Sequence, residues 1–183
     1  VGISLRGWHG STGVDDYGLS ASLDISRVLA WIRRQPDVSG IVLVGFSMGG
    51  LMAALAAADQ PAGALDGVVL VNAPAELRSF ARDTAFGGAR RYLEKTLQPR
   101  QWQDSSPLNH ADRLSHPLLV VVGTEDTMTP PDQGRRLADA APASALFEVA
   151  GMGHHPTHGE WAQILEAADT QFDLGHGLAT RDR

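Results

Sequence analysis

The sequence predicts an α/β fold with one mostly parallel sheet of about five strands flanked by helices. Its 183 residues are enough for a single domain. Hydrophobic residues make up 43% and charged residues 20% of the chain, which is an ordinary globular composition. Short apolar runs alternate with stretches of helical periodicity, and this alternation is typical of parallel strands joined by right-handed crossovers.

Five apolar runs bounded by Gly, Asn or Pro are predicted to be strands, at residues 1–5, 40–45, 67–72, 117–123 and 145–150. Most of them are continuously apolar, as a sheet covered on both faces requires. Apolar residues recur at helical spacing between the runs. The predicted helices lie around residues 25–32, 48–55, 131–141 and 161–168.

We expect one core within residues 1–175. The stretch 75–116 is too long for a simple crossover, so it predicts a small insertion of short helices lying over the sheet edge. Residues 176–183 show no apolar period and are predicted to be a frayed tail.

Charge and cysteine content exclude several classes of function. Fifteen Lys and Arg residues against 21 Asp and Glu give a formal charge of −6, which argues against binding to nucleic acid or to an anionic membrane. The expected partner is a small molecule. The lack of cysteine excludes disulfides, thiolate metal sites and a cysteine nucleophile. Because no apolar stretch approaches the roughly 20 residues of a membrane span and the start lacks a signal-peptide pattern, we expect a cytoplasmic protein.

The most specific motif is GFSMGG at residues 45–50, between a predicted strand and a predicted helix. A serine in such a turn adopts a strained backbone, and we expect a side chain at either Gly45 or Gly49 to collide with the neighbouring strand or helix. The hydroxyl of Ser47 then projects clear of the sheet. The amide of Met48 begins a helix and is predicted to stabilise an oxyanion beside that hydroxyl.

A serine nucleophile needs a base, and the base needs an acid that orients it. Asp126 leads the loop after the run 117–123, and His154 follows the run 145–150 in the sequence GMGHH. The carboxyl ends of parallel strands meet at one edge of a sheet, where catalytic groups gather. The sequence therefore predicts that Ser47, Asp126 and His154 converge at this edge.

Nearby residues leave alternatives open. For the acid, the alternatives are Glu125 and Asp104, and for the base they are His155 and His158. A zinc site built from the histidines and Glu160 matches no helical ligand spacing. Neither a metal nor another cofactor is therefore expected.

Four segments, in chain order, resemble the α/β-hydrolase superfamily of serine hydrolases: RGWHGSTG, GFSMGG, SSPLNHADRLSHPLLVVVGTEDTMTPP and VAGMGHHP. The Ser-Pro-Leu and acid segments are similar to the branch of esterases and acyl-aminoacyl peptidases. The resemblance implies a Ser47, Asp126 and His154 triad in a carboxylesterase-like hydrolase that forms an acyl-enzyme. The alternatives are a peptidase or amidase of the same fold, and a catalytically impaired fragment or non-catalytic remnant.

The resemblance also implies a truncated α/β-hydrolase fold that lacks the N-terminal strands of the superfamily. The chain starts at Val1 rather than Met, and residues 1–5 match the fourth strand of that fold. An absent third strand would leave a gap of about 9–10 Å, two strand spacings. Three outcomes are open: a fragment of a longer protein, the product of an incomplete gene, or direct pairing of residues 1–5 with residues 41–44.

Direct pairing would place the loop of residues 8–13 beside Ser47. The amide of Trp8 would then be the second oxyanion donor, next to Met48. A strand edge exposed at residues 1–5 would also favour a homodimer.

Overall fold

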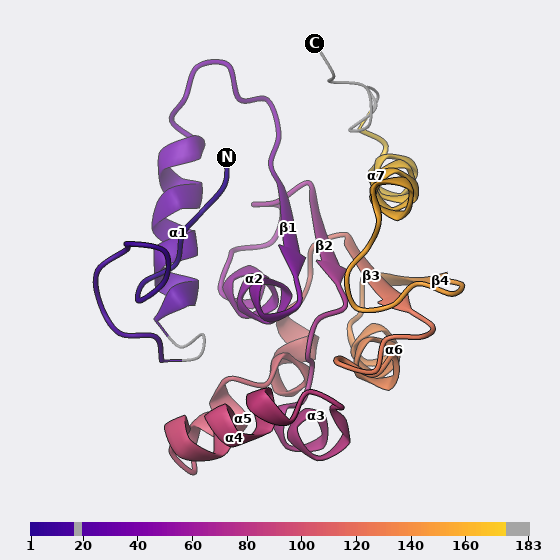
Figure 1. The fold of residues 1–183 in the computed structure, drawn as a ribbon. Coiled ribbons are helices and arrows are strands. Elements are labelled where there is room, and N and C mark those ends of the chain that lie inside the picture. The colour runs from indigo at the N-terminus through magenta and orange to yellow at the C-terminus, as the bar shows by residue number, and fades with distance from the viewer. Residues whose placement is uncertain (17–19, 175–183) are drawn as a thin grey trace.

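The computed structural model describes residues 1–16 and 20–174, and its centre is a parallel sheet in the order β1-β2-β3-β4 (Figure 1). The strands are β1 (Val42–Phe46), β2 (Gly67–Val71), β3 (Leu118–Gly123) and β4 (Ser144–Val149). In register, Val69 of β2 lies opposite Val44 of β1 and Leu119 of β3. The predicted parallel sheet with flanking helices is confirmed, and four of the five predicted runs supply its strands.

Helices cover both faces of the sheet, and two hydrophobic cores lie between the layers. Helices α2 (Met48–Ala58) and α6 (Asp132–Ala140) cover one face, with α1 (Ala21–Ile32) packed against α2, and α7 (His158–Phe172) covers the other face (Figure 1). Val68 and Leu70 point into the first core, whereas Val69 and Val71 point into the second. Burial on both faces explains why the run 67–71 is apolar throughout.

Residues 1–5 form no strand, so the predicted fifth strand and its direct pairing with residues 41–44 are wrong. This segment lies beside α1 instead (Figure 1). Directly after it, the Arg6 guanidinium donates two hydrogen bonds of 2.6 Å to the Asp24 carboxylate of α1. The prediction fails because the neighbour is a helix, whose backbone groups are already hydrogen-bonded and cannot form a strand ladder.

An open slot of about 520 Å³ lies between residues 1–5 and β1. The apolar residues Ile25 and Leu29 of α1 also line it. Among the residues that the structure describes, β1 pairs only with β2, and Val44 on β1 is 43% exposed. On this side of the sheet the unpaired strand edge is therefore β1 and not residues 1–5, the expected position of a homodimer edge.

A helical cover, residues 77–113, connects β2 to β3. It consists of α3 (Leu77–Asp83), α4 (Gly87–Thr96), α5 (Gln101–Asp104) and the 3-10 helix η1 (Pro107–Arg113). Leu77, Phe80 and Leu93 anchor it in the first core. Figure 1 shows α3, α4 and α5 beyond the carboxyl ends of the strands, so the cover overlies the edge where the predicted catalytic residues lie.

Within residues 1–16 and 20–174, no helix is both long and apolar enough to cross a membrane. The frayed tail predicted for residues 176–183 lies outside the described residues.

Candidate active site

Ser47 occupies the sharp turn between β1 and α2. Its φ of 52° and ψ of −124° lie in a region that residues other than glycine rarely adopt. The Ser47 N–H donates to the carbonyl of Val71 at 2.9 Å, which ties the turn to the end of β2. The surrounding strands therefore hold the serine in a strained conformation, as the motif predicts.

Two glycines make the turn possible, but they are not the expected pair. A Cβ on Gly45 would lie 2.6 Å from the Cα of Gly50, and a Cβ on Gly50 would lie 2.6 Å from the Cβ of Ala73. A Cβ on Gly49 would meet nothing within 4 Å, because Gly49 faces the slot beside β1. The expected collision at Gly49 is thus wrong, and the close approach of α2 to the chain after β2 falls on Gly50.

The structure brings Ser47, His154 and Asp126 together at the carboxyl ends of the strands. His154 Nε2 lies 2.9 Å from Ser47 Oγ, and His154 Nδ1 lies 2.8 Å from Asp126 Oδ2. The side chains of His154 and Asp126 are 7% and 0% exposed. When Nδ1–H donates to the carboxylate, Nε2 is left as an acceptor for the serine hydroxyl.

The Asp126 carboxylate is fixed before any substrate binds. Its Oδ1 accepts hydrogen bonds of 2.8 Å from the N–H groups of Met128 and Thr129, in the loop that follows it. Its Oδ2 remains for His154. Hydrogen bonds to an ionised carboxylate are strong, so the acid is oriented by its own loop.

The competing residues take no part in this series of hydrogen bonds. Glu125 is exposed, and Asp104 at the end of α5 forms an ion pair with Arg100 at 3.3 Å. The exposed ring of His155 packs on Phe46, with 5.7 Å between ring centroids. His158 is exposed at the first position of α7. None of these side chains is hydrogen-bonded to Ser47 or His154 in the described part of the chain.

The two predicted oxyanion donors differ in outcome. Met48 is the first residue of α2, and the first amides of a helix have no intrahelical acceptor and lie at the positive end of the helix dipole. The Trp8 amide instead donates to the carbonyl of Leu5 at 3.1 Å within a turn, so its prediction as second donor is wrong. Trp8 lies near the site all the same, because it lines the adjoining cavity.

A cavity of about 380 Å³ opens beside Ser47 and His154. Its other walls are Trp8, Met48, Pro74, Phe80, Phe86, Gly88, Ala89, Tyr92, Met128 and Thr129. The lining is mostly apolar, and it contains no Asp, Glu, Lys or Arg among the described residues. An apolar cavity with a few polar groups at one end is the usual form of a small-molecule site.

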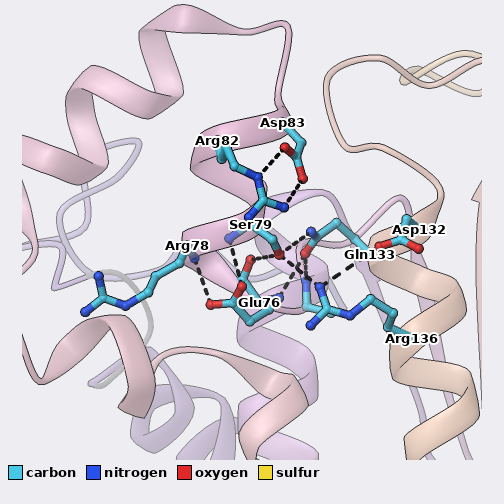
Figure 2. A network of polar contacts seen from close by, with 9 residues as sticks. Glu76, Arg78, Ser79, Arg82, Asp83, Asp132, Gln133 and Arg136 are labelled. Atoms are coloured by element: carbon cyan, nitrogen blue, oxygen red, sulfur yellow. Dashed lines mark hydrogen bonds and ion pairs between the residues drawn. The ribbon is translucent and has the colours of Figure 1, made fainter.

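Gln133 of α6 fastens the helical cover next to this cavity (Figure 2). Its side-chain oxygen accepts from the N–H groups of Ala75 and Glu76 at 3.0 and 2.9 Å. Its NH2 group donates to Ser79 Oγ at 2.9 Å. Because Gln133 is 2% exposed and all its polar atoms are paired, it fixes the start of α3 and with it the wall residue Phe80.

Two carboxylates stabilise the same wall. Glu76 caps α3 by accepting from the N–H groups of Arg78 and Ser79 (Figure 2). Burial acts to raise the pKa of Glu76, but these N–H groups bring the pKa below its ordinary value. The hydroxyl of Tyr92 donates to Asp15 at 2.7 Å, and burial together with this carboxylate raises the pKa of Tyr92 to about 12.

No group of three or more metal-ligating side chains gathers within residues 1–16 and 20–174. His154 is committed to Ser47 and Asp126, and Glu160 accepts from the N–H of Thr157 in the cap of α7. The histidines and Glu160 that the sequence offered as zinc ligands therefore do not form a cluster in the described residues.

Sequence reasoning missed Asn72 at the carboxyl end of β2. The residue has a φ of 48° and is 1% exposed. Its side chain contacts the backbone of Gly123, Gly153 and His154. The available signal was a polar residue at the end of the apolar run 67–72, which marks a strand boundary but does not reveal these partners.

Comparison with known proteins finds one matching family, a related esterase sequence and several similar structures. Residues 8–145 match the prolyl oligopeptidase family. Esterase LipC of Mycobacterium tuberculosis is 28% identical over 171 residues, which cover 81% of this chain and 42% of the esterase. A puromycin hydrolase has 22% identity and a TM-score of 0.70, with 86% of this chain and 25% of the hydrolase covered. Acetyl xylan esterase 1 of Thermoanaerobacterium sp. JW/SL YS485 has 16% identity and a TM-score of 0.68, with 94% and 65% covered.

The structural likenesses, all at low identity, show the shared fold. The chain spans less than half of the related esterase and a quarter of the puromycin hydrolase. The family match extends over well more than half of the chain. The chain therefore belongs to the prolyl oligopeptidase family, a family of serine hydrolases with the α/β-hydrolase fold.

Proposed function

We propose that this protein is a serine hydrolase that cleaves carboxylic esters of small molecules through Ser47, His154 and Asp126. The observation that carries the proposal is an unbroken series of hydrogen bonds from Ser47 Oγ through His154 to the buried Asp126. At the Ser47 end of this series lies an apolar cavity large enough for a small acyl group.

In the proposed reaction, Ser47 Oγ attacks the carbonyl carbon while His154 Nε2 takes the hydroxyl proton. The negative charge that develops on the carbonyl oxygen lies beside the Met48 N–H at the start of α2. His154 returns the proton to the leaving alcohol, and Asp126 stabilises the imidazolium. A water molecule, deprotonated by His154, then attacks the acyl carbon, and His154 gives the proton to Ser47 Oγ as the acid leaves. No cofactor takes part in these steps.

The cavity supports an ester with an apolar acyl group. Its walls carry no charged side chain that would recognise a charged acyl chain or a free peptide terminus, within the described residues. Phe80, Ala89 and Met128 instead offer apolar contact surface. Burial of about 25 cal/mol per Å² of apolar surface would favour acyl chains longer than acetyl.

Peptide or amide cleavage is the second candidate, and the family match favours it. The same triad cleaves amides by the same steps, with an amine in place of the alcohol as leaving group. A third candidate is a remnant with too few oxyanion donors, because loss of one donor costs about 10²–10³-fold in rate.

Two measurements test the proposal. Wild type should react with a fluorophosphonate probe and hydrolyse p-nitrophenyl butyrate, whereas Ser47→Ala should lose the label and about 10⁴-fold or more of the turnover. Ser39→Ala, at an exposed position outside the site, is the matched control. Equal labelling of wild type and Ser47→Ala would refute the assignment of the nucleophile.

The p-nitroanilide of the same acyl group separates the candidates. A higher kcat/KM for the ester supports the esterase, and a kcat/KM for the anilide equal to or above that for the ester supports the peptidase or amidase. Labelling of Ser47 without turnover of either compound supports the remnant.

A further inference from the structure

Asn72 connects three parts of the chain that meet at the proposed active site. Its Oδ1 accepts from the Gly123 N–H at 2.8 Å, and its Nδ2 donates to the carbonyls of Gly153 and His154 at 3.1 and 2.8 Å. The orientation of the amide is unambiguous, because one end faces an N–H and the other faces two carbonyl oxygens.

These contacts reach across the sheet. β2 and β4 are not neighbours, since β3 lies between them. Gly123 ends β3 just before the loop that carries Asp126, and the two carbonyls belong to the loop after β4 that carries His154. One side chain directly after β2 therefore holds the backbones of both the acid loop and the base loop.

The backbone at Asn72 suits this task. Its N–H donates to the Val121 carbonyl at 2.9 Å, which continues the ladder between β2 and β3. Its left-handed φ of 48° is a conformation that asparagine tolerates better than most residues. Burial of 99% leaves no water to replace the three hydrogen bonds if the side chain is removed.

We propose that Asn72 is a positioning residue, which holds the backbone of His154 so that one ring nitrogen faces Ser47 and the other faces Asp126. The proposal rests on the proposed function, because it assigns Asn72 a task in that site. Asn72 does not line the cavity, so it affects catalysis through His154 and not through substrate contact.

Two variants test the proposal. Asn72→Asp keeps the size and the acceptor for Gly123, but it turns an oxygen toward the two carbonyls. Asn72→Gly keeps the left-handed backbone and removes all three side-chain hydrogen bonds, and it serves if Asn72→Asp does not fold. Val69→Ala is the matched control, because Val69 is fully buried in β2, the strand that leads to Asn72, and its apolar side chain cannot hydrogen-bond to either loop.

The first readout is kinetic. A displacement of about 1 Å in a catalytic group costs up to about 10²-fold in rate. We expect kcat for p-nitrophenyl butyrate to fall about 10–100-fold in the Asn72 variants with KM nearly unchanged. Val69→Ala should lower the melting temperature and keep kcat.

The second readout does not need turnover. The proton on His154 Nδ1, bonded to the Asp126 carboxylate, should give a low-field ¹H NMR resonance that exchanges slowly with water. We expect this resonance in wild type and in Val69→Ala, and its loss or faster exchange in folded Asn72 variants.

The outcomes are distinct. If wild type shows the resonance but hydrolyses neither ester nor anilide, the proposed function fails and the resonance alone decides the role of Asn72. An unchanged resonance with unchanged kcat in the Asn72 variants, equal losses in Val69→Ala, or no resonance in wild type would overturn the proposal.

Discussion

Replacement of Gly50 by alanine should damage the site mainly through its contact with Ala73. The added Cβ would lie 2.6 Å from the Cβ of Ala73, whereas carbon atoms in contact prefer about 3.5–4.0 Å. The turn and the chain after β2 must therefore separate by about 1 Å. Ser47 Oγ lies 2.9 Å from His154 Nε2, so a shift of this size away from the base breaks their hydrogen bond.

We expect Gly50→Ala to lower kcat for p-nitrophenyl butyrate by about 10²-fold, the cost of such a misplacement. Overpacking should also reduce the free energy of unfolding by about 1–3 kcal/mol, measured by urea denaturation. Ala73→Gly removes the opposing Cβ, so the double variant should recover most of both losses.

Gly49→Ala is the matched control. Its Cβ would meet nothing within 4 Å, and alanine is favoured over glycine in a helix by up to about 1 kcal/mol. We expect unchanged kcat and equal or higher stability. The reasoning is refuted if Gly50→Ala keeps wild-type kcat, if Gly49→Ala loses as much activity, or if Ala73→Gly rescues nothing.

Two further predictions concern the cavity and the response to pH. Ala89→Phe fills part of the cavity, so the ratio of kcat/KM for p-nitrophenyl octanoate over acetate should fall at least about tenfold, and an unchanged ratio would place the acyl chain elsewhere. His116 is 1% exposed, and burial lowers its pKa below the ordinary 6.5. The unfolded chain therefore binds a proton first as pH falls, and stability is lost between pH 6.5 and the lower pKa of the folded state. His116→Leu should lose less stability than wild type in urea titrations between pH 7.5 and 5.5, and parallel curves would contradict this.

Much of the fold follows from local pattern. The runs at 67–71 and 118–123 are apolar throughout because both of their faces are buried, and this pattern can be recognised without knowing the partners. Residues 1–5 have a similar composition but lie beside a helix. Composition indicates that a segment can be extended; whether it joins a sheet depends on a neighbour that the pattern does not specify.

Part of the candidate site could likewise be predicted from the sequence, and part could not. Ser47, Asp126 and His154 could be predicted because parallel strands bring their carboxyl ends to one edge. The steric conflict of an added Cβ at Gly50, and not at Gly49, could not be predicted, because it depends on the path of the chain at Ala73. Asn72 was missed for a related reason, since its partners lie 51, 81 and 82 positions along the chain.

The origin of the cavity wall has a consequence for how this scaffold can diversify. Phe80, Phe86, Ala89 and Tyr92 come from one contiguous stretch of the helical cover, whereas the proposed reacting groups stand on the turn and loops after β1, β3 and β4. Most of the cavity wall and the proposed reacting groups are thus encoded by separate blocks of sequence, and Met128 and Thr129 of the acid loop contribute to both. Exchange of the block from 77 to 96 would re-specify which acyl groups are accepted and leave the machinery that breaks the bond in place.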